Sequence, residues 1–215
     1  MSDMQTDVQK ELTAMLNKGC DEMGINVSES QQAQLIEYIQ LFEKWNKAYN
    51  LSAVRNVRQM IGRHLLDSLV VAPLIEGERF IDVGTGGGLP GIPLAIMFPE
   101  RNFTLLDSNG KKTRFLFQVK TQLKLDNVSV VNTRVEAFQP DDLFDGVISR
   151  AFASLLDMTT GCKHLLADGG RFWALKGIYP EDELSALEKN YKVSASFSLR
   201  VPGEEGERHL LALTP

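Results

Sequence analysis

The residues that most directly suggest chemistry lie in one glycine-rich segment, which reads FIDVGTGGGLPG from Phe80 to Gly91. The apolar run that opens it is typical of a buried parallel strand, and a helix is expected after it. Glycines at such a turn let the backbone approach a ligand closely, and the following helix offers free N–H groups. Pro90 is expected at the first helical position, where a missing N–H is tolerated. The segment predicts a small-molecule site.

The spacing of the glycines separates two kinds of nucleoside site. Gly84, Gly86 and Gly88 form G-x-G-x-G, and Leu89 stands where the dinucleotide fingerprint has its third glycine. Asp107 ends the second expected strand, where a carboxylate can accept the ribose hydroxyls of a nucleoside. The pattern therefore predicts nucleoside binding with the spacing of a methyltransferase and disfavours a dehydrogenase.

Three further residues are expected at the same site because ligands of parallel sheets lie beyond the carboxyl ends of the strands. Val135 and Glu136 follow the third expected strand, and Arg150 follows the fourth. Two simpler roles fit the sequence equally well. Glu136 can be an acid at a helix N-terminus, and Arg150 can belong to a surface ion pair.

Short apolar runs alternate with helical stretches from residue 79 onward, which predicts right-handed crossovers and a parallel sheet. The last two runs flank a Pro-Gly loop and predict an antiparallel hairpin. We expect an α/β, Rossmann-like fold with a mostly parallel seven-stranded sheet. The expected strands are Arg79–Val83, Phe103–Asp107, Val128–Val131, Gly146–Ser149, Arg171–Leu175, Val193–Leu199 and His209–Leu213.

The first 75 residues are expected to be helical. Ser28 and Gln31 form a capping box, and an apolar stripe from Leu35 to Trp45 follows at helical spacing. A third helix is expected from Ile61 to about Pro73. We therefore divide the chain into an N-terminal helical subdomain, residues 1–75, and a methyltransferase core, residues 76–215.

Composition limits the partners and the compartment. The 215 residues are 43% hydrophobic and carry a net charge of −5, but residues 44–63 and 111–124 each hold five basic residues and no acid. Such basic runs suit a nucleic-acid partner. The two cysteines, Cys20 and Cys162, lack metal-ligand spacing, and no secretory signal or long apolar run is present. We expect a cytoplasmic protein with no metal, no membrane partner and no DNA partner.

Several motifs in fixed order resemble the bacterial ribosomal small-subunit methyltransferase G family, also called glucose-inhibited division protein B. The resemblance runs from about Gln31 to Leu213. It implies S-adenosylmethionine-dependent methylation of guanine N7 in 16S ribosomal RNA, with Gly84, Leu89, Val135, Glu136 and Arg150 touching the cofactor. Many members have proline where this chain has Gly87, which should loosen the loop slightly. The motifs lie at residues 44–51, 63–68, 82–93, 105–112, 148–152 and 174–177.

Guanine N7 attacks as a neutral lone pair, so no general base and no other catalytic residue is obligatory. The RNA, free or within the small ribosomal subunit, is expected to contact Arg63, His64, Arg134 and Arg208. For His64, a structural role inside a helix is the simpler interpretation. Two other functions stay open: methylation of a small molecule or protein, and nucleotide binding without catalysis.

Overall fold

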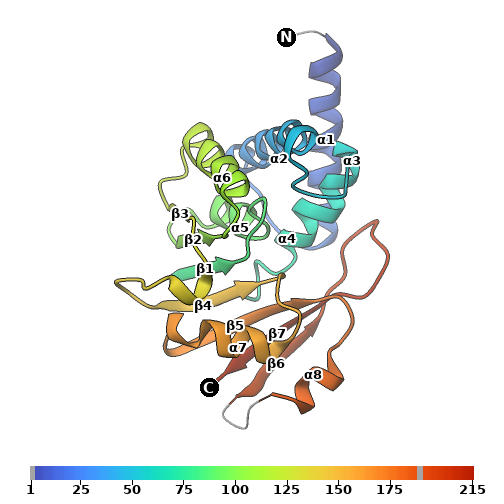
Figure 1. Ribbon diagram of the computed structural model, residues 1–215. Helices are drawn as coiled ribbons and strands as arrows, with labels where there is room; N and C mark the ends of the chain where they lie inside the picture. The colour runs from blue at the N-terminus through green and yellow to red at the C-terminus, as the bar shows by residue number, and fades with distance from the viewer. Residues whose placement is uncertain (1–2, 188–190) are drawn as a thin grey trace.

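A computed structural model describes residues 3–187 and 191–215, which form a seven-stranded sheet between two layers of helices (Figure 1). The strand order is β3-β2-β1-β4-β5-β7-β6. Neighbours among β1 to β5 pair in parallel, whereas β7 runs antiparallel to both β5 and β6. The predicted sheet and its antiparallel end are confirmed. The strands are β1 (Arg79–Val83), β2 (Asn102–Leu106), β3 (Val128–Val131), β4 (Phe144–Ser149), β5 (Leu166–Lys176), β6 (Lys192–Ser198) and β7 (His209–Thr214).

The helices divide between the two faces of the sheet. On one face, α1, α2, α5 and α6 share a core with Phe80, Phe103 and Trp173, and on the other α7 packs over Phe172. In the described part of the chain, no helix is both long and apolar enough to cross a membrane. The helices are α1 (Asp3–Glu22), α2 (Glu29–Tyr49), α3 (Val57–Met60), α4 (Asp67–Leu69), α5 (Gly91–Met97), α6 (Gly110–Leu123), α7 (Leu155–Cys162) and α8 (Glu181–Ser185), with 3₁₀ turns at Val135–Ala137 and Lys163–Leu165.

The N-terminal helices follow the predicted pattern with one departure. The capping box is present, since the Ser28 hydroxyl accepts the N–H of Gln31 and the Gln31 side chain accepts the N–H of Ser28. The expected third helix is broken into α3, a π-helix at Ile61–Leu66 and α4. The wider π turn carries Arg63 and His64, and π turns are frequent at functional sites. The proposed subdomain boundary after residue 75 falls in the connection between α4 and β1.

The start of α5 differs by one residue from the prediction. Pro90 is the N-cap and α5 begins at Gly91, because the Pro90 backbone is not helical, with φ of −91° and ψ of 1°. The Asp82 carboxylate accepts the Gly91 N–H at 2.9 Å. A carboxylate at this position satisfies a backbone donor that would otherwise be unpaired and opposes the positive end of the helix dipole. The hydrogen bond from Gly91 to Asp82 therefore ties the end of the glycine segment to β1 where the helix starts.

Candidate active site

The carboxyl ends of the parallel strands meet at one edge of the sheet, where the glycine loop begins. Val83 at the end of β1 aligns with Leu106 at the end of β2, and Leu106 aligns with Val131 at the end of β3. The Gly84 N–H then donates to the Leu106 carbonyl at 2.8 Å, which ties the loop to the neighbouring strand. This edge is where parallel α/β sheets bind ligands.

Two of the predicted glycines present open backbone at this edge. Gly84 is exposed with φ of +70°, and an added Cβ would lie 2.6 Å from that of Ala151. Gly86 has φ of +62°, and an added Cβ would meet no atom within 4 Å. Positive φ favours glycine, and the missing side chains leave the backbone accessible. Gly88 instead lies buried against Ile92 and Leu116.

Asp107 joins the loop to the start of α6. Its Oδ2 accepts the Gly86 N–H at 2.9 Å, its Oδ1 accepts the Asn109 N–H at 2.9 Å, and the Lys112 Nζ lies 3.6 Å from Oδ2. The residue is only 6% exposed. Because each carboxylate oxygen has two lone pairs, both retain capacity for a further donor such as a ribose hydroxyl.

A hollow of about 310 Å³ opens beside Asp107. Its volume falls at the lower end of small-molecule sites, about 300–1,000 Å³. Five of the predicted residues line it: Gly84, Asp107, Arg134, Val135 and Glu136. Leu106, Ala151 and Phe152 contribute apolar surface to the lining of this hollow. Leu89 and Arg150 are not among the lining residues, and Leu89 is half-buried against the core. We call this space the β1–β3 hollow.

Arg150 lies in a second hollow of about 310 Å³, at the carboxyl ends of β4 and β5. Its Nη1 lies 3.3 Å from Oδ2 of Asp67, and Arg208 donates to Oδ1 of the same carboxylate. Lys176 and His209 line the same space. The Lys176 ammonium also donates to the Phe152 carbonyl at 3.5 Å, next to the first hollow. We call this space the β4–β5 hollow.

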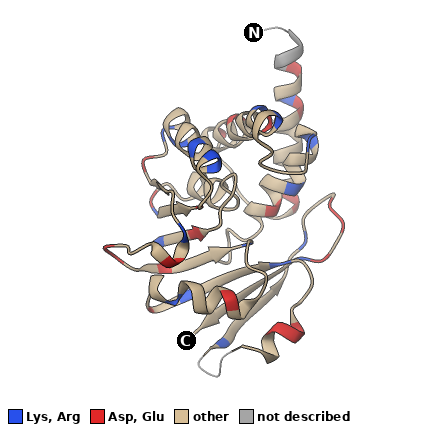
Figure 2. Cartoon of the chain, in the orientation of Figure 1, with Lys and Arg blue, Asp and Glu red and all other residues tan. Residues whose placement is uncertain are grey.

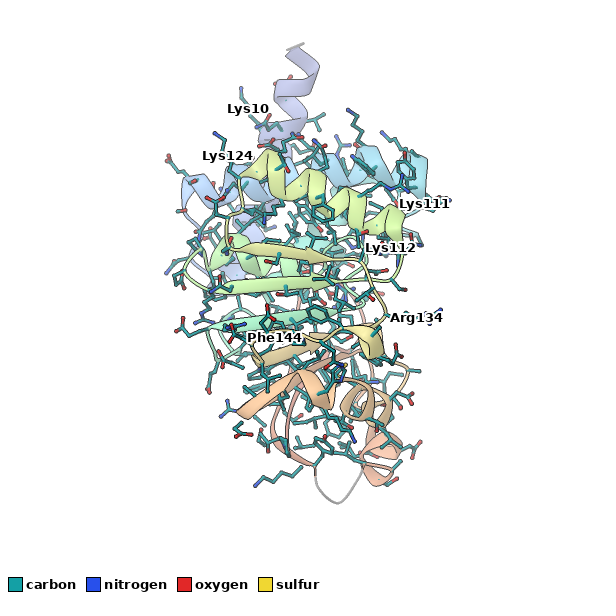
Figure 3. The ribbon with its side chains drawn as sticks, turned by 60° about the vertical axis from the view of Figure 1, so that its left-hand side comes forward. Lys10, Lys111, Lys112, Lys124, Arg134 and Phe144 are labelled. Carbon is teal, nitrogen blue, oxygen red and sulfur yellow. The ribbon has the colours of Figure 1, made fainter. Side chains whose placement is uncertain are left out.

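The four residues predicted to contact RNA do not share one surface. Arg134 is exposed at the rim of the β1–β3 hollow, and Figure 3 shows its side chain pointing away from the protein. Arg63 pairs with Glu204 at 3.3 Å, and Arg208 lines the β4–β5 hollow. His64 is 6% exposed, and its ring packs 5.1 Å from Phe42. Burial argues against RNA contact for His64 and favours the structural interpretation.

Burial changes the ionisation of two residues near the loop. Desolvation raises the pKa of Asp82 from 3.8 to about 6, although hydrogen bonds from Thr85 and Gly91 oppose the shift. Its Oδ1 is buried and has no partner among the described residues. Desolvation lowers the pKa of His64 below its ordinary value, so its imidazole is neutral at physiological pH.

Sequence reasoning did not assign roles to Asp67, Asp82 or Lys176. Asp82 stands two residues before the first glycine of the loop, and this position in the sequence could have indicated a role for it. Asp67 lies four residues after Arg63, but its ion pair with Arg208 joins residues 141 apart in the sequence. Only the folded chain reveals that contact.

Comparison with known proteins identifies the family. A family model described as rRNA small subunit methyltransferase G, GidB, matches residues 31–211. A protein of that name from Cellvibrio japonicus is 61% identical over 215 residues, which cover 98% of each chain. Another from Saccharophagus degradans is 64% identical over 189 residues, covering 88% of this chain and 85% of that one.

Solved structures share the fold at low sequence identity. A SAM-dependent methyltransferase from Geobacter sulfurreducens, solved with S-adenosyl-L-homocysteine, aligns with a TM-score of 0.55 and 13% identity over 82% of this chain and 98% of that one. The glycopeptide N-methyltransferase MtfA aligns with a TM-score of 0.60 and 12% identity over 71% and 87%. The predicted Rossmann-like methyltransferase fold is confirmed, and the chain belongs to the rRNA small subunit methyltransferase G family.

Proposed function

We propose that this protein transfers a methyl group from S-adenosylmethionine to N7 of a guanine in 16S ribosomal RNA. The observation that carries the proposal is the pair of adjoining hollows, one beside Asp107 and one beside Asp67, in a chain of this family. The first hollow suits a nucleoside cofactor, and the second suits a polar base. The acceptor is naked RNA or RNA within the small ribosomal subunit, and both occur in the cytoplasm.

The residues of the β1–β3 hollow fit S-adenosylmethionine. Asp107 would accept the ribose hydroxyls, Leu106 and Val135 offer apolar surface to a base, and the bare backbone at Gly84 admits close approach. When bound, the cofactor supplies a methyl group carried on a positively charged sulfur. Arg150 follows β4, and its guanidinium lies beside Asp67 in the second hollow. We therefore assign Arg150 to the acceptor side and not to the cofactor.

The β4–β5 hollow would hold the guanine. A guanine amino group is a hydrogen-bond donor, whereas its O6 and N7 are acceptors. Asp67 can accept from the donor edge, and Arg208 can donate to O6. Glu205 and Glu207 also line this hollow, so carboxylates surround a ring that becomes positively charged when N7 is methylated. Charge of this kind favours the transition state over the neutral ground state.

The residues around the two hollows hold and orient the reactants and need not move a proton. His64 is buried and neutral, and Asp82 is enclosed by its own loop contacts. Positioning alone can supply a large rate increase, with effective molarities of roughly 10⁵–10⁸ M in good cases. An unpaired guanine suits such a site, because loops present single bases more easily than duplexes do.

The test is transfer of labelled methyl from S-adenosylmethionine to small subunits that lack the modification, to free ribosomal RNA and to cell extract. The proposal predicts label in RNA. Label in protein or in small molecules would replace it with another methyltransferase activity. Cofactor binding without any transfer would instead indicate a nucleotide-binding module.

A further inference from the structure

Helices α2 and α6 lie antiparallel on the outer layer of the molecule. Near one end of the pair, Gln34 donates to the Leu123 carbonyl at 3.1 Å, and near the other the Trp45 ring lies 5.6 Å from the Phe115 ring. The C-terminal end of α2 therefore lies beside the N-terminal half of α6. That half begins at the Asn109 cap, two residues from Asp107.

A hollow of about 430 Å³ lies between the C-terminal half of α2 and the C-terminal half of α6, with Lys44, Trp45, Tyr49 and Gln118 among the residues that line it. Tyr49 is 45% exposed, and its ring lies 5.0 Å from that of Trp45 at an angle of 32°. Trp45 in turn packs against Phe115, so the exposed Tyr49 ring is held in place by two further aromatic rings. Exposed aromatic rings of this kind stack on unpaired bases.

Three cations of α2 and α6 have no acidic partner among the described residues; Lys44 lines the hollow, and the other two lie in the first half of α6. Lys44, Lys111 and Arg114 are exposed, and no carboxylate in the described residues pairs with them. Figure 2 shows Lys and Arg along α6 with no Asp or Glu, and Figure 3 shows Lys111 and Lys124 at its two ends. By contrast, Arg58 is held by Glu11 and Arg63 by Glu204.

We propose that this α2–α6 face binds single-stranded RNA next to the target guanine, with one unpaired base stacked on Tyr49 and phosphates on Lys44, Lys111 and Arg114. The inference rests on the proposed function. Charge complementarity supports it, because unpaired cations gather here in a chain whose net charge is −5. Continuity supports it too, because Lys112, the neighbour of Lys111, lines the β1–β3 hollow.

An unpaired strand fits this face better than a duplex. A duplex offers its phosphates but keeps its bases stacked inside, so it would leave the aromatic hollow unused. An unpaired strand can place a base in the hollow while its phosphates meet the flanking cations.

The test compares RNA affinity, its salt dependence and cofactor affinity among charge variants. The variant K44Q/K111Q/R114Q removes three unpaired cations from the face. Its matched control, K10Q/K163Q/K192Q, removes three exposed cations elsewhere that form no ion pair with the described residues. Affinity is measured for free ribosomal RNA and for small subunits that lack the modification, and cofactor affinity is measured by calorimetry.

The face variant should weaken RNA binding at least tenfold and flatten the plot of log affinity against log salt. The slope should change by about 0.7 for each phosphate of a single strand that the protein no longer neutralises. Cofactor affinity should stay unchanged, and the control should bind like the wild type. Equal effects of the two variants would overturn the proposal. So would weaker binding confined to assembled subunits, because it would point to a protein partner.

Stacking is tested separately at Tyr49. Tyr49→Leu should weaken RNA binding about five- to hundredfold, the range for loss of one stacked base. Its salt slope should stay unchanged, and Tyr49→Phe, which keeps the ring, should bind like the wild type. Equal affinity of the Leu and Phe variants would overturn the stacking contact. If the wild type methylates no RNA at all, the proposed function fails; normal methylation with unaffected variants would reject this face alone.

Discussion

The Asp107 carboxylate accepts the Gly86 N–H at 2.9 Å, so the acid at the end of β2 fixes the shape of the loop that follows β1. One side chain, itself in the lining of the β1–β3 hollow, thus joins the glycine loop to the start of α6. The same carboxylate keeps lone pairs for a ligand, which means that loop geometry and ribose recognition depend on the same residue.

Asp107→Asn should weaken S-adenosylmethionine binding about ten- to hundredfold, because hydrogen bonds to a charged group contribute roughly 1.5–3 kcal/mol. The variant keeps one oxygen for the loop and should fold normally. Calorimetric titration measures the affinity, and Asp126→Asn, at an exposed carboxylate outside both hollows, serves as the control. Wild-type affinity in the Asp107 variant would mean that the ribose binds elsewhere.

Asp67→Asn should raise the KM for the RNA acceptor about tenfold and leave cofactor affinity unchanged, because the Asp67 carboxylate orients Arg150 and Arg208 in the β4–β5 hollow. Steady-state kinetics and calorimetry separate the two quantities. Asp142→Asn is a suitable control, since Asp142 pairs with Arg79 at the amino end of β1. A change in cofactor affinity without a change in acceptor KM would contradict the assignment.

The raised pKa of Asp82 predicts that the stability of the folded protein depends on pH. Its pKa is about 6 in the folded chain and 3.8 as a free side chain, so between these values the folded state binds the extra proton. Stability from this residue therefore falls as pH rises from about 4 to about 6, by an amount on the order of 3 kcal/mol. Denaturant unfolding across this range should show this decline as the difference in stability between the wild type and Asp82→Asn. In Asp82→Asn that component should be missing, and identical pH curves for the two proteins would refute the raised pKa.

The rate of methyl transfer should be nearly flat from about pH 7 to 9, because no proton leaves N7 before attack and the neutral His64 does not titrate there. Single-turnover rates measure the profile. His64→Ala should alter the rate through packing against Phe42 and leave the profile's shape unchanged. A rise or fall of the wild-type rate with pH that is absent from the His64→Ala variant would establish a general base.

Local patterns were sufficient to predict the fold, whereas the site needed tertiary contacts. Alternating apolar runs located all seven strands, and the capping box located the start of α2. Residues 61–66 have ordinary helical spacing, so nothing in the sequence distinguished the π turn. Counting charges along the sequence also overestimated the positive charge that residues 44–63 offer to a partner. Glu11 and Glu204, which are distant in sequence, pair with Arg58 and Arg63.

The position of the new methyl group tests transfer to N7 most directly. Ribosomal RNA methylated by this protein is treated with mild borohydride and aniline, which cleave the strand at N7-methylguanine. We predict cleavage at a single guanine of the small-subunit RNA, present after reaction with the wild type and strongly reduced with the Asp107→Asn variant at limiting cofactor. Methylated RNA that resists cleavage would contradict transfer to N7.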